Sequence, residues 1–326
     1  MDGALFPAAG CLPPWAEAQE RVSGFHHVRI DGAVFPLVRR GRQLRPLRTD
    51  LSFSGLPLVA RGDIIARLFT QTGAQSALFA NIPAAGPFWD SLPANRVVLR
   101  RWERASLAVA GSFEAWFEDN FERKRRKEYR RLRARLGESG RLESLALQPG
   151  SDPSAWAEEL FALEARGWKG ARGTAIAAHE ITAAALREAL KGLNEQGHLR
   201  FWKLALDGKP LAMMFALVHQ DQAWLGKIAH DEGFAKFSPG VLLVLDATEA
   251  FFSEGGINLV DSCAIPDHPM INHIWRNRLP MADVLIAAPG ASPLAFGALV
   301  AWERFKRAAR ALARGAWYRV TKRRRS

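Results

Sequence analysis

The stretch LRFWKLALDGKPLAMMFALVH, residues 199–219, consists of two runs of strand-forming residues joined at Asp207-Gly208. Asp-Gly between two such runs is a strong hairpin signal. A third strand-like run, AWLGKIAH, occupies residues 223–230, and the loop DEGFAKFSPG follows over residues 231–240. The apolar run over residues 241–253 predicts a helix that Gly255-Gly256 ends, and INLVDSCA over 257–264 predicts a buried strand. The order of elements is therefore strand, strand, strand, loop, helix and strand.

The N-terminal part of the chain repeats this order. HHVRIDGAVFPLVRR, residues 26–40, predicts a hairpin at Asp31-Gly32, and RQLRPLRTD over 42–50 is a third run. A loop over 51–57, a helix over 61–72 and a strand over 74–80 follow. Each copy also carries an aspartate before a loop that contains Phe-Ser: Asp50 before Phe53-Ser54, and Asp231 before Phe237-Ser238. The common order predicts a duplicated α/β unit.

Length and composition bound the class of protein. The chain has 326 residues, 48% of them hydrophobic and 24% charged, which fits a globular protein of about two domains. Its two cysteines, Cys11 and Cys263, are too few for a disulfide framework or a four-cysteine zinc site. The N-terminus has no basic segment before its apolar residues, so we expect no signal peptide and a cytoplasmic protein.

A membrane-spanning helix is not expected in the uncharged run over residues 284–302. Pro289 and Pro293 interrupt this run, which instead predicts a loop followed by the start of a helix.

The positive charge is concentrated in two segments. The chain carries a formal net charge of +12, which predicts attraction to phosphates, anionic lipid or an acidic partner. Residues 121–135 hold nine basic and two acidic side chains, a net of +7, and residues 302–326 hold ten basic and one acidic, a net of +9. These two segments sum to +16, so the rest of the chain is slightly acidic.

The first basic segment belongs to an expected long helix that begins after Ser112, an N-cap residue, and ends near Gly137 or Gly140. Its apolar residues recur at helical spacing, so one face can pack while the arginines face outward. A solvated face and a binding surface are both compatible with this pattern.

The second basic segment follows Ser292 and Pro293, which predict the start of a second helix. Leu294, Phe305 and Leu312 share one face of this helix, together with Ala298 and Ala309. A basic amphipathic helix of this kind is typical of docking on a membrane surface or an acidic partner. Packing of the helix on its own domain, with a frayed basic tail, is the alternative.

Four segments resemble one known family: FALEARGW (161–168), GHLRFWKLALDGKPLAMMFALV (197–218), FSPGVLL (237–243) and INLVDSCAIPDHPMINHIW (257–275). The sequence resembles the FemAB-like branch of the GNAT acyltransferase superfamily, and within it the CelD-like proteins named after cellulose biosynthesis. The resemblance implies an α/β fold of tandem duplicated GNAT-like units, with mixed sheets flanked by helices. We therefore expect a degenerate N-terminal half over residues 1–110, a basic connecting helix over 111–140, an acyltransferase domain over 141–290, and a basic amphipathic helix and tail over 291–326.

The loop before the helix at residue 241 is the expected binding site for the phosphates of an acyl-CoA co-substrate. A helix N-terminus presents backbone N–H groups and a positive dipole end, Ser238 can cap, Pro239 is tolerated at N1, and Gly240 lets a ligand approach closely. The expected cofactor-binding residues are Phe237, Ser238, Pro239, Gly240, Val241, Leu242 and Lys227. An ordinary capped helix start is the alternative, and an outward-facing strand lysine is the alternative for Lys227. The counterpart Ser54-Gly55-Leu56-Pro57 looks less suited to a ligand.

Three residues at strand ends are candidate general bases: Asp261, His230 and Asp231. In GNAT-like folds the donor lies between two splayed parallel strands, which here are expected over 223–230 and 257–263. Asp261 lies within an apolar strand, where burial raises a carboxyl pKa. The alternative for Asp261 is a buried carboxylate that holds a loop by hydrogen bonds.

The expected substrate-binding residues are Trp168, Lys169, His268, His273 and Trp275, although Trp168 can equally pack at a helix end. His268, His273 and Asp267 lack a recognised metal-ligand spacing, so no metal site is expected. Cys263 is expected to be a buried strand residue.

These observations are compatible with three functions. The first hypothesis is an acyltransferase that moves an acyl group from acyl-CoA or an acyl carrier protein to an amine or hydroxyl of a small molecule, polysaccharide or cell-envelope precursor. The second is a nucleic-acid-binding protein or a transferase that uses aminoacyl-tRNA, which the basic segments favour. The third is a non-catalytic protein at a membrane surface.

Overall fold

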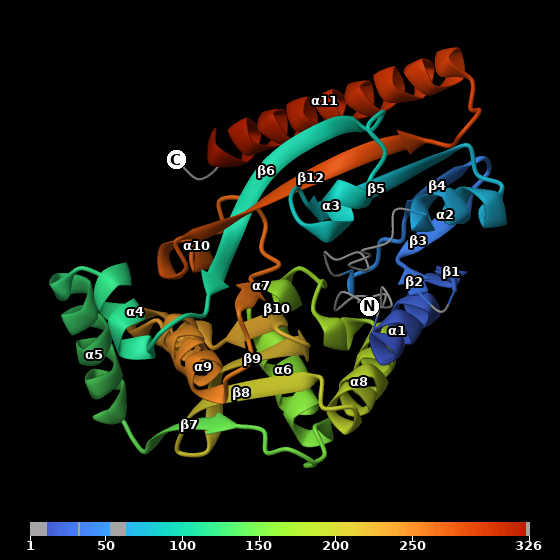
Figure 1. The fold of residues 1–326 in the computed structure, drawn as a ribbon. Coiled ribbons are helices and arrows are strands. Elements are labelled where there is room, and N and C mark those ends of the chain that lie inside the picture. Colours follow the sequence, from blue (N-terminus) through green and yellow to red (C-terminus); the bar gives the residue numbers. More distant parts are fainter. Residues whose placement is uncertain (1–11, 32, 53–62, 324–326) are drawn as a thin grey trace.

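The computed structural model describes residues 12–31, 33–52 and 63–323, with side chains for all of these except Pro87 and residues 314–323. Within this part of the chain, ten strands form one mixed sheet in the order β3-β4-β5-β12-β6-β11-β10-β9-β8-β7, and β1 and β2 form a separate small sheet. Helices cover the sheet, and the long helix α11 lies along β6 and β12 (Figure 1). The fold is thus mixed α/β, as the sequence predicts.

The strands are β1 (Val28–Ile30), β2 (Ala33–Phe35), β3 (Leu37–Arg40), β4 (Gln43–Pro46), β5 (Ser76–Pro83), β6 (Val97–Ala108), β7 (Leu142–Ala146), β8 (Leu199–Leu206), β9 (Lys209–His219), β10 (Gln222–His230), β11 (Leu259–Asp261) and β12 (Asn277–Ala287). The helices are α1 (Pro13–Ser23), α2 (Ile64–Thr72), α3 (Pro87–Ser91), α4 (Phe113–Asn120), α5 (Arg123–Gly137), α6 (Ser154–Arg166), α7 (Trp168–Ala171), α8 (Glu180–Glu195), α9 (Pro239–Glu254), α10 (Ile271–Ile274) and α11 (Pro293–Arg323), with 3-10 turns η2 (Ile176–Ala178) and η3 (Glu232–Phe237).

The C-terminal half has the predicted order of elements. β8 and β9 form an antiparallel hairpin, and its turn residues Asp207 and Gly208 both have positive φ, as this kind of turn requires. β10 follows, the loop contains η3, and α9 connects to β11, which pairs with β10 in parallel. The hairpin, the helix and the final strand are confirmed.

The N-terminal half contains the same parallel pair, because β4 and β5 are joined through α2. The hairpin at Asp31 is confirmed as β1 and β2, but its second strand ends where a continuous run was expected. Pro36 has no N–H to donate and separates β2 from β3, which pairs with β4 in the large sheet. The predicted Phe-Ser loop and residues 54–57 lie outside the described residues.

The two halves are joined at the centre of the sheet by exchanged strands. β12, from the C-terminal half, pairs with β5, and β6, from the N-terminal half, pairs with β11. β6 and β12 also pair with each other along most of their length. Residues 284–287 belong to β12, so the prediction that a loop begins at residue 284 is wrong. The side chains of residues 284–286 are buried within the sheet. The loop starts after Ala287, and α11 follows.

The segment after Ser112, which was expected to form one basic helix, forms the two helices α4 and α5. Ser112 caps α4 as predicted, because its hydroxyl accepts a hydrogen bond from the Ala115 N–H at 3.2 Å. The chain then becomes extended at Phe121, whose buried ring packs edge-on against Tyr129. The Arg126 side chain donates to the Phe121 carbonyl and stabilises the break, and α5 ends at Gly137 as predicted.

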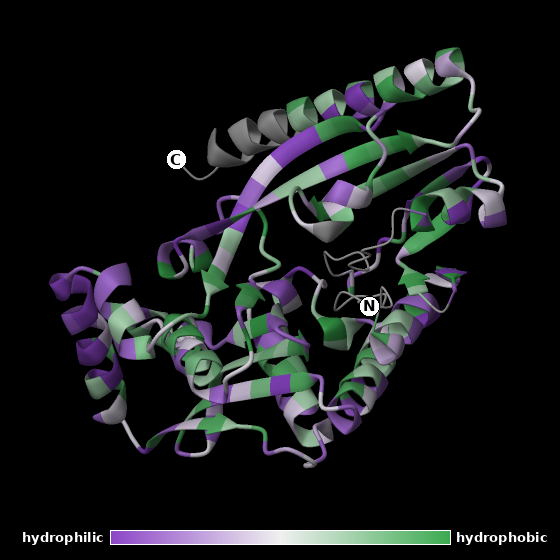
Figure 2. Cartoon of the chain, in the orientation of Figure 1, coloured by the Kyte–Doolittle hydropathy of each residue, from purple (hydrophilic) through white to green (hydrophobic). Residues whose placement is uncertain are grey.

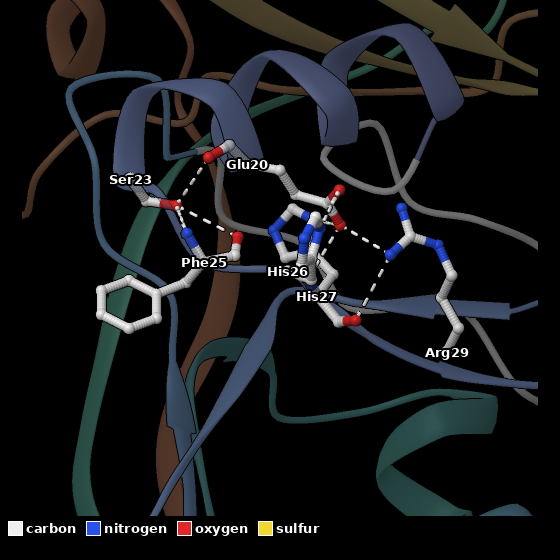
Figure 3. Close-up of polar contacts among 6 residues, drawn as sticks. All are labelled: Glu20, Ser23, Phe25, His26, His27 and Arg29. Atoms are coloured by element: carbon white, nitrogen blue, oxygen red, sulfur yellow. Dashed lines mark hydrogen bonds and ion pairs between the residues drawn. The ribbon is translucent and has the colours of Figure 1, made fainter.

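Glu20 fixes the N-terminal helix to the small sheet (Figure 3). Its carboxylate contacts the His26 ring at 3.2 Å and Arg29 at 2.7 Å, and accepts a hydrogen bond from the His27 N–H at 2.8 Å. Burial alone raises the pKa of Glu20, but hydrogen bonds from Arg29, His27 and His26 outweigh it and lower the pKa to about 2. Burial lowers the pKa of His27 to about 4.

Two cores lie on opposite faces of the C-terminal part of the sheet. On one face, residues of α9 and α5 pack with alternate residues of β8 and β9, such as Leu204 and Met214. On the other face, α1, α6 and α8 cover Phe201 and Phe215. Residues of β10, among them Trp224 and Ala229, belong to this second core.

Candidate active site

The parallel strands β10 and β11 diverge after a short pairing. Gln222 pairs with Leu259 and Trp224 with Asp261, after which β11 ends while β10 continues to His230. The chain leaves β11 through Cys263, whose φ of 51° turns the backbone away from the sheet. The parallel pair expected from the sequence is thus present, and an opening is bordered by residues 225–227 of β10 and by Cys263 after β11.

A β-bulge in β10 lies beside this opening. Leu225 pairs with Ala216 and Ile228 with Met214, so the single residue Phe215 lies opposite both Gly226 and Lys227. Gly226 is required here, because a Cβ atom at this position would lie 2.1 Å from Cε2 of Phe215. Since a bulge leaves a residue out of the ladder, Gly226 and Lys227 have no partner in register on β9 or β11.

A pocket of about 140 Å³ opens at the bulge. It lies between α1, the segment 50–52, β9 and β10, so the N-terminal part of the chain supplies one of its walls. Its lining residues are Trp15, Asp50, Leu51, Ser52, Phe215, Leu225, Gly226, Lys227 and Cys263. Its floor is apolar, and its ionisable groups include one carboxylate and one amine.

Lys227 is the basic group of the pocket and is partly buried beside Glu164. Its Nζ lies 3.8 Å from Oε1 of Glu164, and the same oxygen accepts a hydrogen bond from Lys169 at 2.6 Å. Burial lowers the pKa of Lys227, and the nearby carboxylates of Glu164 and Asp50 oppose this shift. A lysine of this kind can exchange a proton more readily than an exposed one.

Glu164 organises this corner of the site. Its second carboxylate oxygen accepts a hydrogen bond from the Ile176 N–H at 2.8 Å, and its side chain is buried. Burial alone raises the pKa of Glu164, but the hydrogen bonds from Ile176 and Lys169 and the charge of Lys227 hold it below its ordinary value. A buried, ionised glutamate therefore links two of the sequence-predicted residues, Lys227 and Lys169.

Trp168 adjoins the same corner. It is 53% exposed, it lies under the Arg172 guanidinium, and its N–H donates to Glu232 at 2.8 Å. Trp168 and Lys169 thus lie within reach of Lys227, whereas the other expected substrate-binding residues are elsewhere.

Asp261 does not face the pocket as an accessible base. It is buried and forms an ion pair with the buried Arg104 of β6, and it accepts a hydrogen bond from the Cys263 N–H at 2.9 Å. Burial raises its pKa, and Arg104 and Cys263 oppose the shift. The geometry favours the alternative left open above, a buried carboxylate that holds the turn after β11.

His230 and Asp231 lie at the far end of β10. The Asp231 carboxylate caps η3 by accepting from the Gly233 N–H at 2.8 Å. The His230 ring packs over Gly240 at the start of α9, beside Met270. Neither residue lines the pocket, so the structure separates them from Lys227.

The start of α9 is less open than the sequence predicts. Ser238 is at the N-cap position, but its side chain makes no capping hydrogen bond. Its backbone has a left-handed conformation, with a φ of 52°. The Val241 and Leu242 N–H groups both donate to the Ser238 carbonyl, and Pro239 has no N–H. A Cβ atom at Gly240 would lie 3.5 Å from Nδ1 of His230 and 3.6 Å from Sδ of Met270, which is ordinary van der Waals contact. Binding of a ligand at Gly240 stays a prediction.

The remaining expected residues are structural or exposed. Trp275 is fully buried and donates to the Thr248 hydroxyl at 3.1 Å, so it belongs to the core and is wrong as a substrate contact. His268 accepts from the N–H groups of Met270 and Ile271 at the start of α10, and burial lowers its pKa. His273 is exposed on the same short helix. Among the described residues, no group of three or more His, Cys, Asp or Glu side chains could hold a metal ion.

Sequence reasoning missed most of the pocket. Trp15, Leu51 and Ser52 come from a part of the chain expected to be a separate half. For Asp50 the sequence predicts no functional role, only that it is the counterpart of Asp231 in the duplicated unit. The signal that could have revealed the bulge is Gly226 inside an otherwise apolar strand, because an isolated strand glycine often indicates a bulge or close backbone approach.

Comparison with known proteins now identifies the domain. Residues 123–268 match the family model described as the acetyltransferase (GNAT) domain. This chain carries a GNAT acetyltransferase domain. The matched range contains β8, β9, β10, α9 and β11, and hence the diverging strands and the bulge. The chain is accordingly an acyltransferase.

Solved structures extend the likeness of fold to both halves. The crystal structure of FemX has a TM-score of 0.56 at 10% identity and covers 88% of this chain and 93% of its own. The C-terminal domain of a putative lysylphosphatidylglycerol synthetase from Agrobacterium fabrum has a TM-score of 0.51 at 13% identity, with 86% and 87% covered. A conserved protein of unknown function from Bacteroides thetaiotaomicron is similar, with a TM-score of 0.51 at 11% identity and 84% and 89% covered. Among curated proteins, none matches the sequence. These likenesses concern the fold, which this chain shares with FemX over most of both chains.

Proposed function

We propose that the chain transfers an acyl group directly from a thioester donor to an amine or hydroxyl acceptor held in the pocket at the β10 bulge. The observation that carries this proposal is the combination of diverging parallel strands, two bulged residues without register partners and an adjoining pocket with Lys227 and Asp50. The donor, an acyl-CoA or an acyl carrier protein, would enter between β10 and β11. The acceptor would be a sugar, peptide or cell-envelope precursor.

The chemistry requires an oxyanion-stabilising group and a base from the protein. The acceptor nitrogen or oxygen attacks the acyl carbonyl, a new bond to the carbonyl carbon forms, the carbon–sulfur bond breaks, and the thiolate leaves. A backbone N–H group at the bulge, where the regular register of the ladder is interrupted, would stabilise the oxyanion that develops on the carbonyl oxygen. Asp50 or a neutral Lys227 can take the acceptor proton, and burial favours the neutral form of Lys227.

A thioester assay with matched variants tests this proposal. Thiol release from a series of acyl-CoA donors would be followed in the presence of amino sugars and peptide amines, with acyl transfer confirmed by mass. Of Lys227→Met and Asp50→Asn, the variant that removes the base should lower kcat by at least about 100-fold, the usual effect of losing a proton-transfer group. Lys209→Met, on an exposed turn, and Asp119→Asn, on an exposed helix end, are the matched controls. Unchanged kcat in both pocket variants would exclude the pocket as the reaction site.

A second candidate donor is an aminoacyl-tRNA. The Val241 and Leu242 N–H groups of α9 donate to the Ser238 carbonyl and Pro239 has no N–H, which leaves fewer backbone donors for a coenzyme pyrophosphate. The basic helix α5 packs against η3, directly before α9, and its arginines and lysines are largely exposed (Figure 2). Such a surface suits an RNA backbone. Release of tRNA from aminoacyl-tRNA, with no thiol released from any acyl-CoA, would select this donor. The converse would select the thioester.

A further inference from the structure

Helix α11 packs on the sheet through polar residues. Glu303 is buried under the helix, forms an ion pair with Arg45 of β4, and accepts from Lys306 at 2.6 Å. Arg307 contacts the buried carboxylate of Asp283 in β12 at 2.5 Å. The helix is therefore held to its own domain by ion pairs, which occupy one side of it.

One apolar row of α11 faces away from the protein, whereas Phe296, Leu299 and Val300 are half-buried on another side of the helix. Leu294, Trp302, Phe305 and Leu312 are 87%, 55%, 62% and 72% exposed. The rings of Trp302 and Phe305 stack with centroids 5.8 Å apart, and hydrophobic segments recur along the helix (Figure 2). The intervening positions on this side are alanines: Ala298, Ala301, Ala308 and Ala309. We call this set of eight residues the α11 stripe.

The α11 stripe concentrates exposed hydrophobic side chains more than the rest of the described surface does. Nine large hydrophobic side chains are exposed among the described residues, and four of them belong to this single stripe. Scattered exposed apolar residues need no explanation, but a contiguous row does, because water contact with it is unfavourable. The stripe runs from Leu294 to Leu312, about five turns of a helix that ion pairs hold to the sheet, so another apolar surface is expected to cover it.

The charge around the stripe indicates what covers it. Arg304 and Arg310 are exposed on the same helix, and residues 302–326 carry a net charge of +9. A second copy of this chain would bring two such segments together, and their charges would repel. An anionic bilayer surface offers both negative charge for the arginines and an apolar boundary for the aromatic rings, which prefer that interface.

We propose that α11 lies on the surface of an anionic membrane, with the α11 stripe inserted at the level of the lipid headgroups. The helix does not cross the bilayer: none of the helices among the described residues combines the length and apolar character that a crossing requires. The inference is independent of the donor and acceptor, because the stripe and the pocket are formed by different residues.

Vesicle co-sedimentation of the full chain tests this proposal. Vesicles of phosphatidylcholine alone are compared with vesicles containing about one third phosphatidylglycerol, at low and high salt. We expect binding to the anionic vesicles that weakens with salt. Trp302→Ser combined with Phe305→Ser should weaken it at least about tenfold, since both rings are lost from the interface. Arg304→Glu combined with Arg310→Glu should weaken it similarly.

Two controls match these changes. Ile181→Ser and Ile265→Ser remove exposed apolar side chains elsewhere on the surface, and Arg141→Glu reverses an exposed charge on a distant turn. All three should bind as the parent chain does, and the circular dichroism of every variant should match it. Failure of the parent chain to sediment with anionic vesicles would overturn the proposal. Binding that persists in the Trp302/Phe305 variant would also overturn it, as would a parent dimer that this variant dissociates.

Discussion

Replacement of Arg104 by methionine distinguishes a structural from a catalytic Asp261. The Arg104 and Asp261 side chains are 2% and 6% exposed, and the guanidinium is the main partner of the carboxylate. Removing one partner of a buried ion pair costs about 3–5 kcal/mol, because the remaining charge stays buried. We therefore expect urea unfolding at pH 7 to show a loss of stability of this size for Arg104→Met. Arg101→Met, an exposed position on the same strand, should lose less than about 1 kcal/mol.

The pH dependence of the Arg104 variant gives a second readout. Burial already raises the pKa of Asp261, and without Arg104 the pKa rises further. The folded variant then binds a proton at a higher pH than the unfolded chain does, so its stability relative to the parent increases as the pH falls. The deficit measured at pH 7 should therefore shrink toward pH 5.

Three outcomes would refute this reasoning about Asp261. The first is a loss below about 1 kcal/mol for Arg104→Met, together with an unchanged pH dependence. The second is an Arg104→Met/Asp261→Leu double variant that is less stable than the single variant, because removing both charges should restore stability. The third is an Asp261→Asn variant that is fully stable and inactive, which would restore Asp261 as a base.

Three further predictions concern the bulge, the N-terminal cluster and the cap of α4. Gly226→Ala should cost about 1–3 kcal/mol in chemical unfolding, since its Cβ would overlap Phe215, and Phe215→Leu in the same chain should recover part of the loss. Burial lowers the pKa of His27 to about 4 from an unfolded value near 6.5, so the unfolded chain binds a proton that the folded chain does not. The free energy of unfolding should therefore fall by about 2 kcal/mol from pH 7 to pH 5. The variant His27→Gln should show a smaller dependence on pH, whereas His26→Gln should not. Ser112→Ala should lower the free energy of unfolding by about 1 kcal/mol through loss of the cap, and a change below about 0.3 kcal/mol would contradict that role.

The local elements could be predicted because their signals are local. Asp207-Gly208 specifies a turn by the φ angles it tolerates, and Ser292-Pro293 specifies the start of α11. The break at Phe121 could not be predicted in the same way. The residues around it favour a helix, and the extended conformation is stabilised by ring packing on Tyr129 and by Arg126, which only the tertiary structure brings together.

The candidate site was predictable only where it coincides with the parallel strands. Lys227 was predicted from its place on the third strand, as a contact for a co-substrate phosphate, and the structure places it at the pocket. Trp15 and Asp50 were not, because no sequence pattern indicates that the first fifty residues pack against β9. Asp261 was misleading for a general reason: a carboxylate in an apolar strand suggests a base, but a buried arginine far away in the sequence can neutralise it.

The exchange of β6 and β12 has a consequence for synthesis on the ribosome. When the N-terminal half has emerged, the free edge of β5 has no partner, because β12 comes much later in the sequence. The same holds for β6, whose neighbours β11 and β12 also emerge later. An open strand edge readily pairs with other chains. The nascent protein therefore has to keep β5 and β6 protected until β12 has emerged, and it is during this interval that we expect chaperones to bind.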